Sequence, residues 1–508
     1  MHTSALTSLL TWQRQMKIRS RCAWRSGFRL KGTGSTLRRW AISLKFSTHG
    51  RVIAAWTMAT ACVLPAANAL ADAGAASAAR DSASVTGTRV LVPGNWQLES
   101  VVILSRHGVR SPTESKPALA TLSPDRWPDW PVSPGYLTDR GADLVGQLGQ
   151  YYGDWLRAKG VLPAQSCPKA GELYAWADVD ERTRRTGNAI IENIAPGCEL
   201  SAVHQTVLTQ PDPIFHAMES GACRVDPLQA RAAIDARLGD AGTQGISQRY
   251  AESLAKVGEV LHFNQSQYCS EHGAEGACRF EALSNAVEVG DDGRHVKLHG
   301  PLGIASTVSE VFLLEYAQGL PEKDVAWGRI RDAEDWRSLL QAHNAQFDLM
   351  AKTPYLASHA GTPLMQQIIG ALEQRATGKA LAGIHAPANN TVYVLAGHDT
   401  NVANIAGMLG LQWTLPDQPD DTPPGGALIF SLWRDPVSSE RYVSVELVYQ
   451  SLAQLRQALP LSIATPPQRL PLPIAGCADS ARTGACRLDD FMRIARKSLV
   501  PACIHPGS

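Results

Sequence analysis

The sequence predicts an α/β protein in which a sheet domain is interrupted by a mostly helical insertion. Strand and helix patterns alternate up to residue 194, helical patterns follow, and strand patterns return after residue 390. Such alternation is typical of a sheet covered by helices. With 508 residues, 44% of them hydrophobic, the chain can bury a large core. We assign residues 90–225 and 350–508 to the sheet domain and 226–349 to the insertion.

The first half of the sheet domain is predicted to contain two strands and two helices. The apolar run from Leu98 to Leu104 predicts one strand, and residues 172–177 predict another. Thr138 can cap a helix because its hydroxyl can accept a backbone N–H of the first turn. A second helix is predicted over 181–194. The capped helix repeats apolar residues at helical spacing, at Leu144, Leu148, Tyr151 and Trp155.

Apolar faces with helical spacing predict three helices of the insertion. The second of them is expected to stop at Gly319 and Pro321, which favour helix ends. Strands are then predicted over 391–395, 427–433 and 442–448. The helical faces consist of Tyr250, Leu254, Val257 and Leu261, then Val308, Val311, Phe312 and Glu315, and finally Trp336, Leu339, Leu340, Phe347 and Leu349.

Residues 1–71 have the pattern of a secretion signal. They contain eleven Lys and Arg but no Asp or Glu, and an apolar run from Val52 to Leu64 precedes small residues up to Ala71. The alternative is a retained membrane anchor, for which this run is short. Arg38-Arg39 suggests a twin-arginine signal, but its flanks fit poorly. Residues 72–89, rich in Ala, Ser and Gly, are expected to form a disordered tether. We therefore expect a periplasmic or secreted protein, without a membrane partner once the signal is removed.

Charge and cysteine content narrow the possible partners. The basic leader leaves 37 Lys and Arg against 47 Asp and Glu, a formal charge of about −10, so a nucleic-acid partner is not expected. Eight cysteines follow the leader, and an even number in an exported protein indicates disulfides. Cys269 with Cys278, and Cys477 with Cys486, are close enough in sequence to form local bridges. Zinc ligation is not favoured, because the chain has no Cys-x-x-Cys pair.

Three polar motifs follow predicted strands, at 106–110, 178–184 and 397–401. Ligands of open α/β sheets bind outside the carboxyl ends of strands, so the three motifs can converge on one pocket. His107 stands between Arg106 and Arg110. Arginine can clamp phosphate oxygens with paired donors, and a neutral imidazole nitrogen can attack phosphorus. This chemistry favours phosphoryl transfer.

The motifs resemble those of the histidine acid phosphatases, and specifically the exported bacterial phytase and acid phosphatase branch. The resemblance rests first on RHGVRSP (106–112) and GHDTN (397–401), and it spans residues 98–503. It implies the histidine phosphatase fold, a three-layer α/β/α sandwich with a helical insertion. Further segments match the branch: ADVDERTRRTG (177–187), QPDP (210–213), HNAQF (343–347) and DTPPGG (421–426). The disulfides implied by the resemblance are Cys167–Cys198, Cys223–Cys503, Cys269–Cys278 and Cys477–Cys486.

The same resemblance assigns roles to individual residues. It makes His107 the nucleophile and Asp399 the proton donor to the leaving oxygen. The phosphate-binding residues that it implies are Arg106, Arg110, Arg182 and His398. Three guanidinium groups can neutralise a transferred phosphate, so neither a metal nor another cofactor is expected. A carboxyl group donates a proton only while it is protonated, which favours an acidic optimum.

Each of these residues also has an ordinary structural alternative. His107 and His398 could be core histidines, and Asp399 could cap the following helix. Asp178 is expected to hold an arginine in place. One arginine of the 178–184 motif is expected at the surface, and the resemblance favours Arg184 for that position. Thr113, Glu310 and His343 are expected either to contact the substrate at the pocket rim or to support the phosphate-binding residues, with a surface position on a helix as the alternative for Glu310.

The expected substrates are small organic phosphates, and the expected state is a monomer. Val109 and Thr400 favour the phytase branch over the glucose-1-phosphatase branch. Glu114 departs from that branch, where a basic residue is usual, and an acid there should repel a polyanion such as phytate. We therefore expect a broad acid phosphatase that also accepts phytate. The alternatives are a sugar phosphatase like glucose-1-phosphatase and a non-catalytic phosphate-binding protein.

Overall fold

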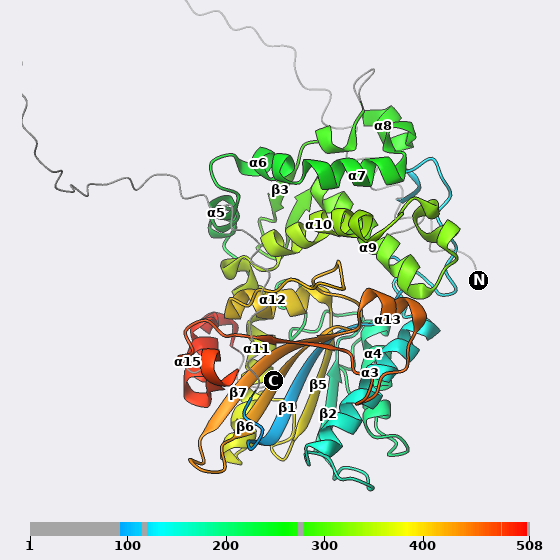
Figure 1. The fold of residues 1–508 in the computed structure, drawn as a ribbon. Helices are drawn as coiled ribbons and strands as arrows, with labels where there is room; N and C mark the ends of the chain where they lie inside the picture. The colour runs from blue at the N-terminus through cyan, green and yellow to red at the C-terminus, as the bar shows by residue number, and fades with distance from the viewer. Residues whose placement is uncertain (1–91, 114–118, 273–277, 479, 505–508) are drawn as a thin grey trace, which may run out of the picture. The chain divides into compact units, whose positions relative to one another are not determined.

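The computed structural model of the chain describes residues 92–113, 119–272, 278–478 and 480–504 (Figure 1). The expected leader (1–71), the expected tether (72–89) and Glu114 lie outside these described residues. No helix within the described ranges is both long enough and apolar enough to cross a membrane.

The sheet domain is built on a mixed sheet of seven strands in the order β2-β5-β1-β6-β7-β8, with β9 paired to β7. Strands β2, β5 and β1 run parallel, while β6, β7 and β8 are antiparallel to their neighbours. The five strands predicted from the sequence are all present. The strand bounds are β1 (Gln97–Arg106), β2 (Leu173–Ala177), β5 (Val392–Gly397), β6 (Ala427–Arg434), β7 (Arg441–Tyr449), β8 (Gln468–Leu472) and β9 (Cys486–Arg487).

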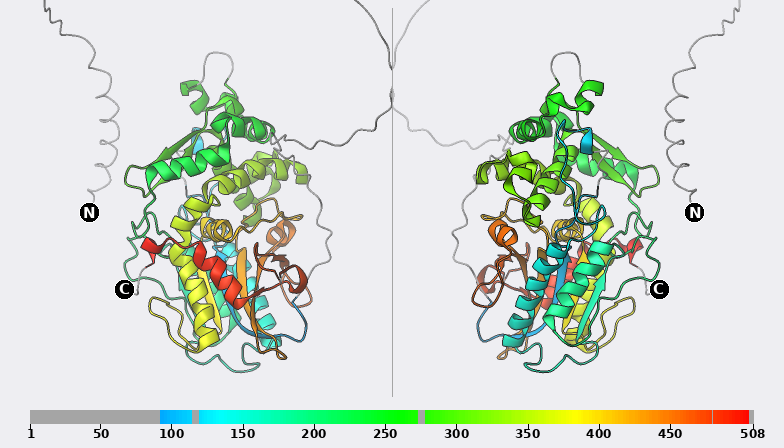
Figure 2. Two further views of the ribbon diagram at one scale, coloured as in Figure 1. Left: turned by 90° about the vertical axis from the view of Figure 1, so that its left-hand side faces the viewer. Right: turned by 90° about the vertical axis from the view of Figure 1, so that its right-hand side faces the viewer.

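Helices cover both faces of this sheet, which confirms the three-layer sandwich. Successive side chains of a strand point to opposite faces. Val101 and Ile103 of β1 therefore pack toward α3 and α4, while Val102 and Leu104 pack toward α11, α12 and α15. Figure 2 shows α11 and α15 in front of the sheet in its left view. The helices are α3 (Asp139–Ala158), α4 (Glu181–Ile194), α11 (Pro354–Thr377), α12 (Asp399–Leu409) and α15 (Leu488–Lys497), with short α13 (Leu452–Gln457), α14 (Ser480–Thr483) and η4 (Pro501–Cys503).

Two helix starts bring functional segments to the end of the sheet. The hydroxyl of Thr138 accepts the backbone N–H of Gly141 at 2.9 Å, so α3 begins where its predicted cap stands. Helix α4 begins at Glu181, within the second polar motif, three residues after Asp178 follows the end of β2. Gly108 lies against the start of α3, where a Cβ atom would come within 2.7 Å of the Gly141 carbonyl oxygen. A glycine after His107 thus allows the turn to approach the helix closely.

The helices between residues 227 and 350 share a second hydrophobic cluster above one end of the sheet (Figure 1). Leu119, Leu122 and Trp127, which precede the expected insertion, also pack in this cluster. The expected domain boundaries stay a prediction. A hairpin that the sequence did not predict, β3 (Ala286–Val289) with β4 (Val296–His299), joins the helices. They are α5 (Pro227–Leu238), α6 (Gly242–Arg249), α7 (Ala251–Leu261), α8 (Gln267–His272), α9 (Pro301–Gln318) and α10 (Ala333–Met350), with η1 (Phe263–Gln265), η2 (Phe280–Ala282) and η3 (Glu322–Gly328).

The structure contains the four disulfides that the resemblance implied. Cys223–Cys503 joins positions 280 residues apart and ties the loop between α4 and α5 to the C-terminal segment. The other three close shorter loops. Bridges that close long loops restrict the unfolded chain most, so we expect Cys223–Cys503 to stabilise the fold most.

Candidate active site

The three polar motifs meet at one edge of the sheet. Arg106 at the end of β1 is in register with Gly397 at the end of β5, and the His107 N–H donates to the Gly397 carbonyl oxygen at 2.9 Å. The Asp178 N–H donates to the carbonyl oxygen of Ala396 in β5 at 3.0 Å. Strand pairing therefore confirms the predicted convergence, because the carboxyl ends of three parallel strands lie side by side.

His107 is buried with its Nε2 atom available. Its Nδ1 lies 2.9 Å from the carbonyl oxygen of Gly108. A carbonyl oxygen can only accept, so Nδ1 carries the proton and Nε2 keeps its lone pair. Burial lowers the pKa of His107 well below its usual value, and Arg182, Arg110 and Arg106 lower it further. The imidazole is therefore neutral in acid, as a nitrogen nucleophile must be.

Arg106 is fully buried and surrounded by carboxylates. Its Nη2 lies 3.0 Å from Asp399 Oδ2 and also contacts Glu310, while its Nη1 lies 2.9 Å from Asp420 Oδ2. Nη1 also donates to the Thr422 carbonyl oxygen. Burial alone would lower the pKa of Arg106, but Asp399, Glu310 and Asp420 outweigh it and raise the pKa. The guanidinium is charged and its position is set from three directions.

Glu310 of α9 holds two arginines at once. Its carboxylate lies 3.0 and 3.1 Å from Arg110 Nη2 and also contacts Arg106. The surface alternative is wrong for Glu310, because its side chain is only 13% exposed and lines the cavity within the arginine cluster. The third arginine, Arg182, pairs with Asp180 Oδ2 at 2.6 Å. Arg184 turns away from the cluster and donates to the Val179 carbonyl oxygen.

The three arginines share one further feature. The Nε atoms of Arg106, Arg110 and Arg182 are all buried, and within the described ranges none has a hydrogen-bond partner. Buried N–H groups are seldom left unpaired, because the lost hydrogen bond with water is costly. The carboxylates thus pair with Nη atoms of the three arginines, and the three Nε–H groups are left without an acceptor in the described part of the chain.

Asp399 faces the arginines from the first turn of α12. Burial raises its pKa, but Arg106 and Arg110 outweigh burial and hold the pKa below its usual value. Its Oδ1 accepts the Thr400 N–H at 2.7 Å. The alternative that Asp399 caps the helix is wrong, because His398 occupies the cap position and Asp399 is the first helical residue.

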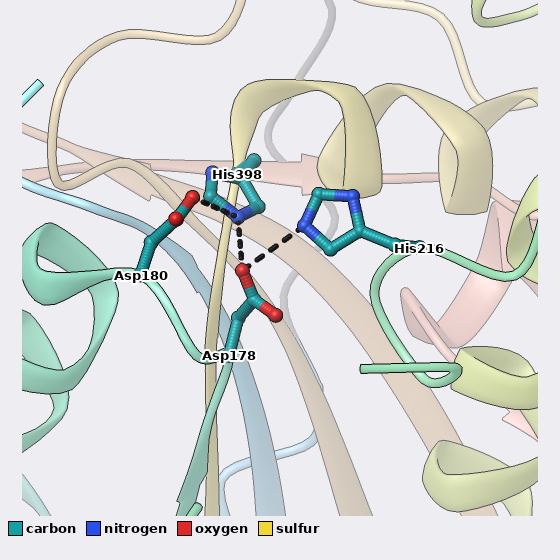
Figure 3. A group of neighbouring side chains, drawn as sticks. All are labelled: Asp178, Asp180, His216 and His398. Carbon is teal, nitrogen blue, oxygen red and sulfur yellow. Dashed lines mark hydrogen bonds and ion pairs between the residues drawn. The ribbon is translucent and has the colours of Figure 1, made fainter. Parts of the chain in front are cut away.

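Behind the arginines lies a chain of alternating histidines and carboxylates (Figure 3). Asp178 Oδ2 lies 2.7 Å from His398 Nε2 and 3.0 Å from His216 Nε2, and His216 Nδ1 lies 2.8 Å from Glu219. Asp178 therefore holds two histidines rather than an arginine. Burial lowers the pKa of His216, but Asp178 and Glu219 outweigh it and raise the pKa to about 10. With both nitrogens donating to carboxylates, His216 is an imidazolium.

His398 is held in the neutral form within this chain. Its Nε2 faces the buried Asp178 carboxylate, and its Nδ1 lies 3.4 Å from Arg182 Nη2. Arginine can only donate, so Nδ1 is the acceptor and Nε2 carries the proton. Burial lowers the pKa of His398, and the opposing effect of Asp178 does not restore it.

The same cluster is a group that could hold a metal ion. Ligand atoms of Asp178, Asp180, His216 and His398 all lie within 4.8 Å of one another (Figure 3). Two imidazole nitrogens and two carboxylates suit zinc or a similar ion. A metal would have to displace the imidazole protons of His216 and His398 that now face Asp178. It would also have to share Asp180 with Arg182. The hydrogen bonds already balance the charge of these carboxylates.

Of the other two residues expected near the rim, His343 lines the cavity and Thr113 is not among its lining residues. His343 is 1% exposed, and its ring stands between Ser306, 3.1 Å from Nδ1, and Asp420, 3.5 Å from Nε2. It therefore supports the carboxylate that holds Arg106. Thr113 is exposed, and its methyl group lies near Gly135, beside Arg182.

Four residues of the site were not predicted from the sequence: Asp180, His216, Glu219 and Asp420. Asp180 belongs to a motif that the sequence singled out, and Asp420 directly precedes the DTPPGG segment, so both had a nearby signal. His216 and Glu219 had none. They reach the site because the loop between α4 and α5 folds back, with the Phe215 carbonyl oxygen accepting from the Asn401 side chain.

A cavity of about 860 Å³ opens in front of these groups. Arg110, Glu310 and Asp399 line its inner end. Its volume lies within the range of about 300–1,000 Å³ that is common for small-molecule sites. His107 lies behind the lining residues, so a phosphate must enter the arginine cluster to reach Nε2.

Residues 97–450 match the model of the histidine phosphatase superfamily, branch 2. Phytase AppA of Escherichia coli is 41% identical over 409 residues, which cover 80% of this chain and 93% of that protein. A glucose-1-phosphatase of Salmonella typhimurium is 31% identical over 404 residues, which cover 78% and 92%.

Solved structures show the same likeness. Hafnia alvei phytase in complex with tartrate is 46% identical, with a TM-score of 0.76, and the match covers 82% of this chain and all of that one. The same phytase in complex with myo-inositol hexakis sulphate is 44% identical, with a TM-score of 0.75 and the same coverage. The match with the family model, together with these relatives, shows that the chain belongs to the histidine phosphatase superfamily, branch 2, and is a hydrolase of phosphate monoesters.

Proposed function

We propose that the arginine cluster binds the phosphate of an organic monoester and that His107 takes up the phosphoryl group in acid. The observation that carries this proposal is the set of three buried Nε–H donors, from Arg106, Arg110 and Arg182, close to a histidine with a free nitrogen. A phosphate offers the acceptors and the negative charge that these groups lack.

The reaction consists of two displacements at phosphorus. In the first, His107 Nε2 forms a bond to phosphorus while the bond to the ester oxygen breaks, and protonated Asp399 gives its proton to that oxygen. In the second, water attacks the phosphohistidine, Asp399 accepts a proton from the water, and the nitrogen–phosphorus bond breaks to release inorganic phosphate. Arg106, Arg110 and Arg182 stabilise the charge of the transferred group in both steps.

Acid conditions favour the first displacement. The guanidinium groups of Arg106 and Arg110 keep the pKa of Asp399 low in the free site. A bound phosphate offsets that positive charge and so makes the protonated carboxyl group easier to form. His107 stays neutral at the same pH because burial and the arginines lower its pKa. The two groups can thus hold the protonation states that the reaction needs.

We further propose that phytate is among the substrates. The relatives include phytases from two organisms, and one of their structures holds an inositol hexasulphate. A cavity of about 860 Å³ is far larger than a single phosphate needs. The second candidate is a sugar phosphatase, supported by the likeness to a glucose-1-phosphatase. Comparing kcat/KM for phytate, glucose 1-phosphate and p-nitrophenyl phosphate from pH 3 to pH 7 separates the two.

Trapping the intermediate tests the mechanism. We expect rapid acid-free quenching during turnover to yield a phosphoenzyme that survives base and is lost in acid, as a phosphoramidate is, and peptide mapping should place the phosphate on His107. A phosphate on another residue, or turnover without a phosphoenzyme, would refute the proposal. Binding of phosphate without any turnover would favour the non-catalytic alternative.

The need for a metal is tested separately. Turnover should survive EDTA, and inhibition that added metal reverses would contradict the metal-free route.

We also propose that the protein is exported and acts as a monomer. Four disulfides favour an oxidising compartment. Cell fractionation together with size-exclusion chromatography tests this. A cytoplasmic location or a stable dimer would refute the respective part.

A further inference from the structure

The β3–β4 hairpin forms a charged side of the same cavity. The cavity lining includes four basic residues of the hairpin, which we name the hairpin wall: Arg294 and His295 in the turn before β4, and Lys297 and His299 within β4. The acidic residues of the hairpin, Glu288, Asp291 and Asp292, do not line the cavity. Glu288 nonetheless lies opposite Lys297 in the pairing of the two strands and pairs with His299, so the unpaired positive charge that the hairpin brings to the cavity comes from Arg294 and Lys297.

The charges of the wall are largely unpaired. Among the described residues, Arg294 and Lys297 have no carboxylate within 4.0 Å, whereas His299 pairs with Glu288 at 2.7 Å. Lys297 and His295 are exposed and Arg294 is half-buried. The wall thus differs from the inner arginines, whose outer nitrogens already face carboxylates.

The wall is held in place at both ends. At its start, the Gly293 carbonyl oxygen accepts the Val225 N–H at 3.0 Å, and Arg294 lies over Gly221, where a Cβ atom would come within 2.8 Å of the guanidinium. Gly221 belongs to the loop that carries His216 into the catalytic cluster. At its far end, β4 leads through Gly300 directly into α9, which carries Glu310. The wall and the arginine cluster are therefore parts of one connected frame.

A substrate with more than one phosphate can reach both groups, because Arg110 and the hairpin wall line the same cavity. A substrate with phosphates around a ring can place one phosphate at the arginines and direct another toward the wall. A substrate with a single phosphate has no second anion for the wall.

We propose that the hairpin wall binds the non-reacting phosphates of a multiply phosphorylated polyol and so selects such substrates over simple monoesters. This inference rests on the proposed function, since it assumes that one phosphate of the same molecule occupies the arginine cluster. Fixed cations at a cavity mouth attract a polyanion and lower its KM more than they change its turnover.

The test removes the two unpaired permanent charges in the variant Arg294→Gln/Lys297→Gln. We expect kcat/KM for phytate to fall roughly tenfold, mostly through KM, because two attractive contacts are lost. Values for glucose 1-phosphate and p-nitrophenyl phosphate should stay within about twofold. The matched control, Lys323→Gln/Lys379→Gln, removes two exposed cations that do not line the cavity and should leave every substrate unchanged.

Two further measurements keep the result clear. Calorimetry with myo-inositol hexakis sulphate and with inorganic phosphate needs no turnover. The Kd of the hexasulphate should rise roughly tenfold in the variant, and that of phosphate should not change. Arg294→Gln could disturb the packing of Arg294 on Gly221, so Lys297→Gln is also measured alone. This residue is exposed, and its substitution should change the Kd in the same direction by a smaller factor.

The outcomes separate this inference from the proposed function. An unchanged phytate kcat/KM and an unchanged hexasulphate Kd in the variant would overturn the role of the wall, and so would an equal loss for all substrates. Failure of the wild-type protein to turn over p-nitrophenyl phosphate would instead refute the proposed function, while the hexasulphate titration would still decide whether the wall binds polyanions.

Discussion

The inner end of the cavity and the hairpin wall both present positive charge, but they hold it differently. At the inner end, Arg106 is fully buried and contacts Glu310, Asp399 and Asp420. On the wall, Lys297 is exposed and has no ion pair among the described residues. The first arrangement sets the geometry before a ligand arrives, and the second leaves charge in contact with water.

This difference indicates different tasks. Donors fixed in a buried, low-dielectric site stabilise developing charge strongly, as a chemical step requires. Exposed charges are screened by salt and contribute mainly to attraction and selection. Changes at the inner end should therefore affect turnover, whereas changes at the wall should affect substrate preference.

The largest effect is expected from His107→Ala. Removing the nitrogen that accepts the phosphoryl group should lower kcat at least about thousandfold for every monoester. Calorimetry should still detect phosphate, because the arginines remain. Steady-state rates on p-nitrophenyl phosphate measure the loss, and His204→Ala, outside the cavity lining, serves as the control. Activity near that of the wild type would rule out His107 as the nucleophile.

Asp399→Asn should have a large effect that depends on the leaving group. Without the carboxyl proton, hydrolysis of an alkyl ester such as glycerol 2-phosphate should slow by roughly a hundredfold or more. The p-nitrophenolate group leaves without a proton, so its ester should slow far less. Single-turnover rates on both esters check this. Equal losses would show that Asp399 acts through position rather than through proton donation.

Glu310→Gln should act on binding at the inner end. The Glu310 carboxylate contacts Arg106 and Arg110, so it competes with phosphate for both. Removing its charge should tighten inhibition by inorganic phosphate by about tenfold, which is the effect of one nearby like charge in a partly screened site. The inhibition constant at pH 5 measures this, with exposed Glu322→Gln as the control. An unchanged constant would mean that Glu310 and phosphate do not compete.

Salt should weaken the contribution of the hairpin wall more than that of the inner end of the cavity, with a smaller effect than the substitutions above. Raising ionic strength from about 0.01 to 0.15 M shortens the screening length from about 30 to 8 Å. We expect kcat/KM for phytate to fall a few-fold and that for p-nitrophenyl phosphate to change less than twofold. Initial rates in sodium chloride measure both. Parallel losses for the two substrates would remove the contrast between wall and inner end.

The smallest effect concerns stability at His216. Its folded pKa of about 10 lies above the ordinary value of 6.5, so its contribution is fully present below pH 6.5 and is lost as pH rises toward 10. The Tm of the wild type should therefore fall across this range by a few degrees more than that of His216→Asn. Differential scanning fluorimetry at pH 6, 8 and 10 measures the slopes, with His204→Asn as the control. Identical slopes would contradict an ion-paired His216.

Much of the fold could be predicted because its signals are local. Short apolar runs before polar motifs identified β1, β2 and β5, and the Thr138 cap identified the start of α3. The hairpin was missed because β3 and β4 are only four residues long and carry charges on their exposed face. Short strands of this kind have little apolar periodicity to detect.

The candidate site was predictable where chemistry lies next to a strand. Arg106, His107, His398 and Asp399 are consecutive pairs at the ends of β1 and β5, so strand pairing alone brings them together. Glu310 was placed at the rim, because nothing in α9 shows that its tenth residue reaches across to β1. His216 was not predicted, because a loop position depends on how the loop folds back.

The sequence by itself determined the reacting groups and the sheet that aligns them, since these depend on periodicity and on neighbours along the chain. Only the tertiary structure decided which carboxylate holds each arginine, that Asp178 joins two histidines, and that basic residues of a distant hairpin face the same cavity. These contacts join segments that are far apart in the chain, as Arg106 and Asp420 show with a separation of 314 residues. Such pairs follow from packing and charge balance in three dimensions and leave no pattern in the local sequence.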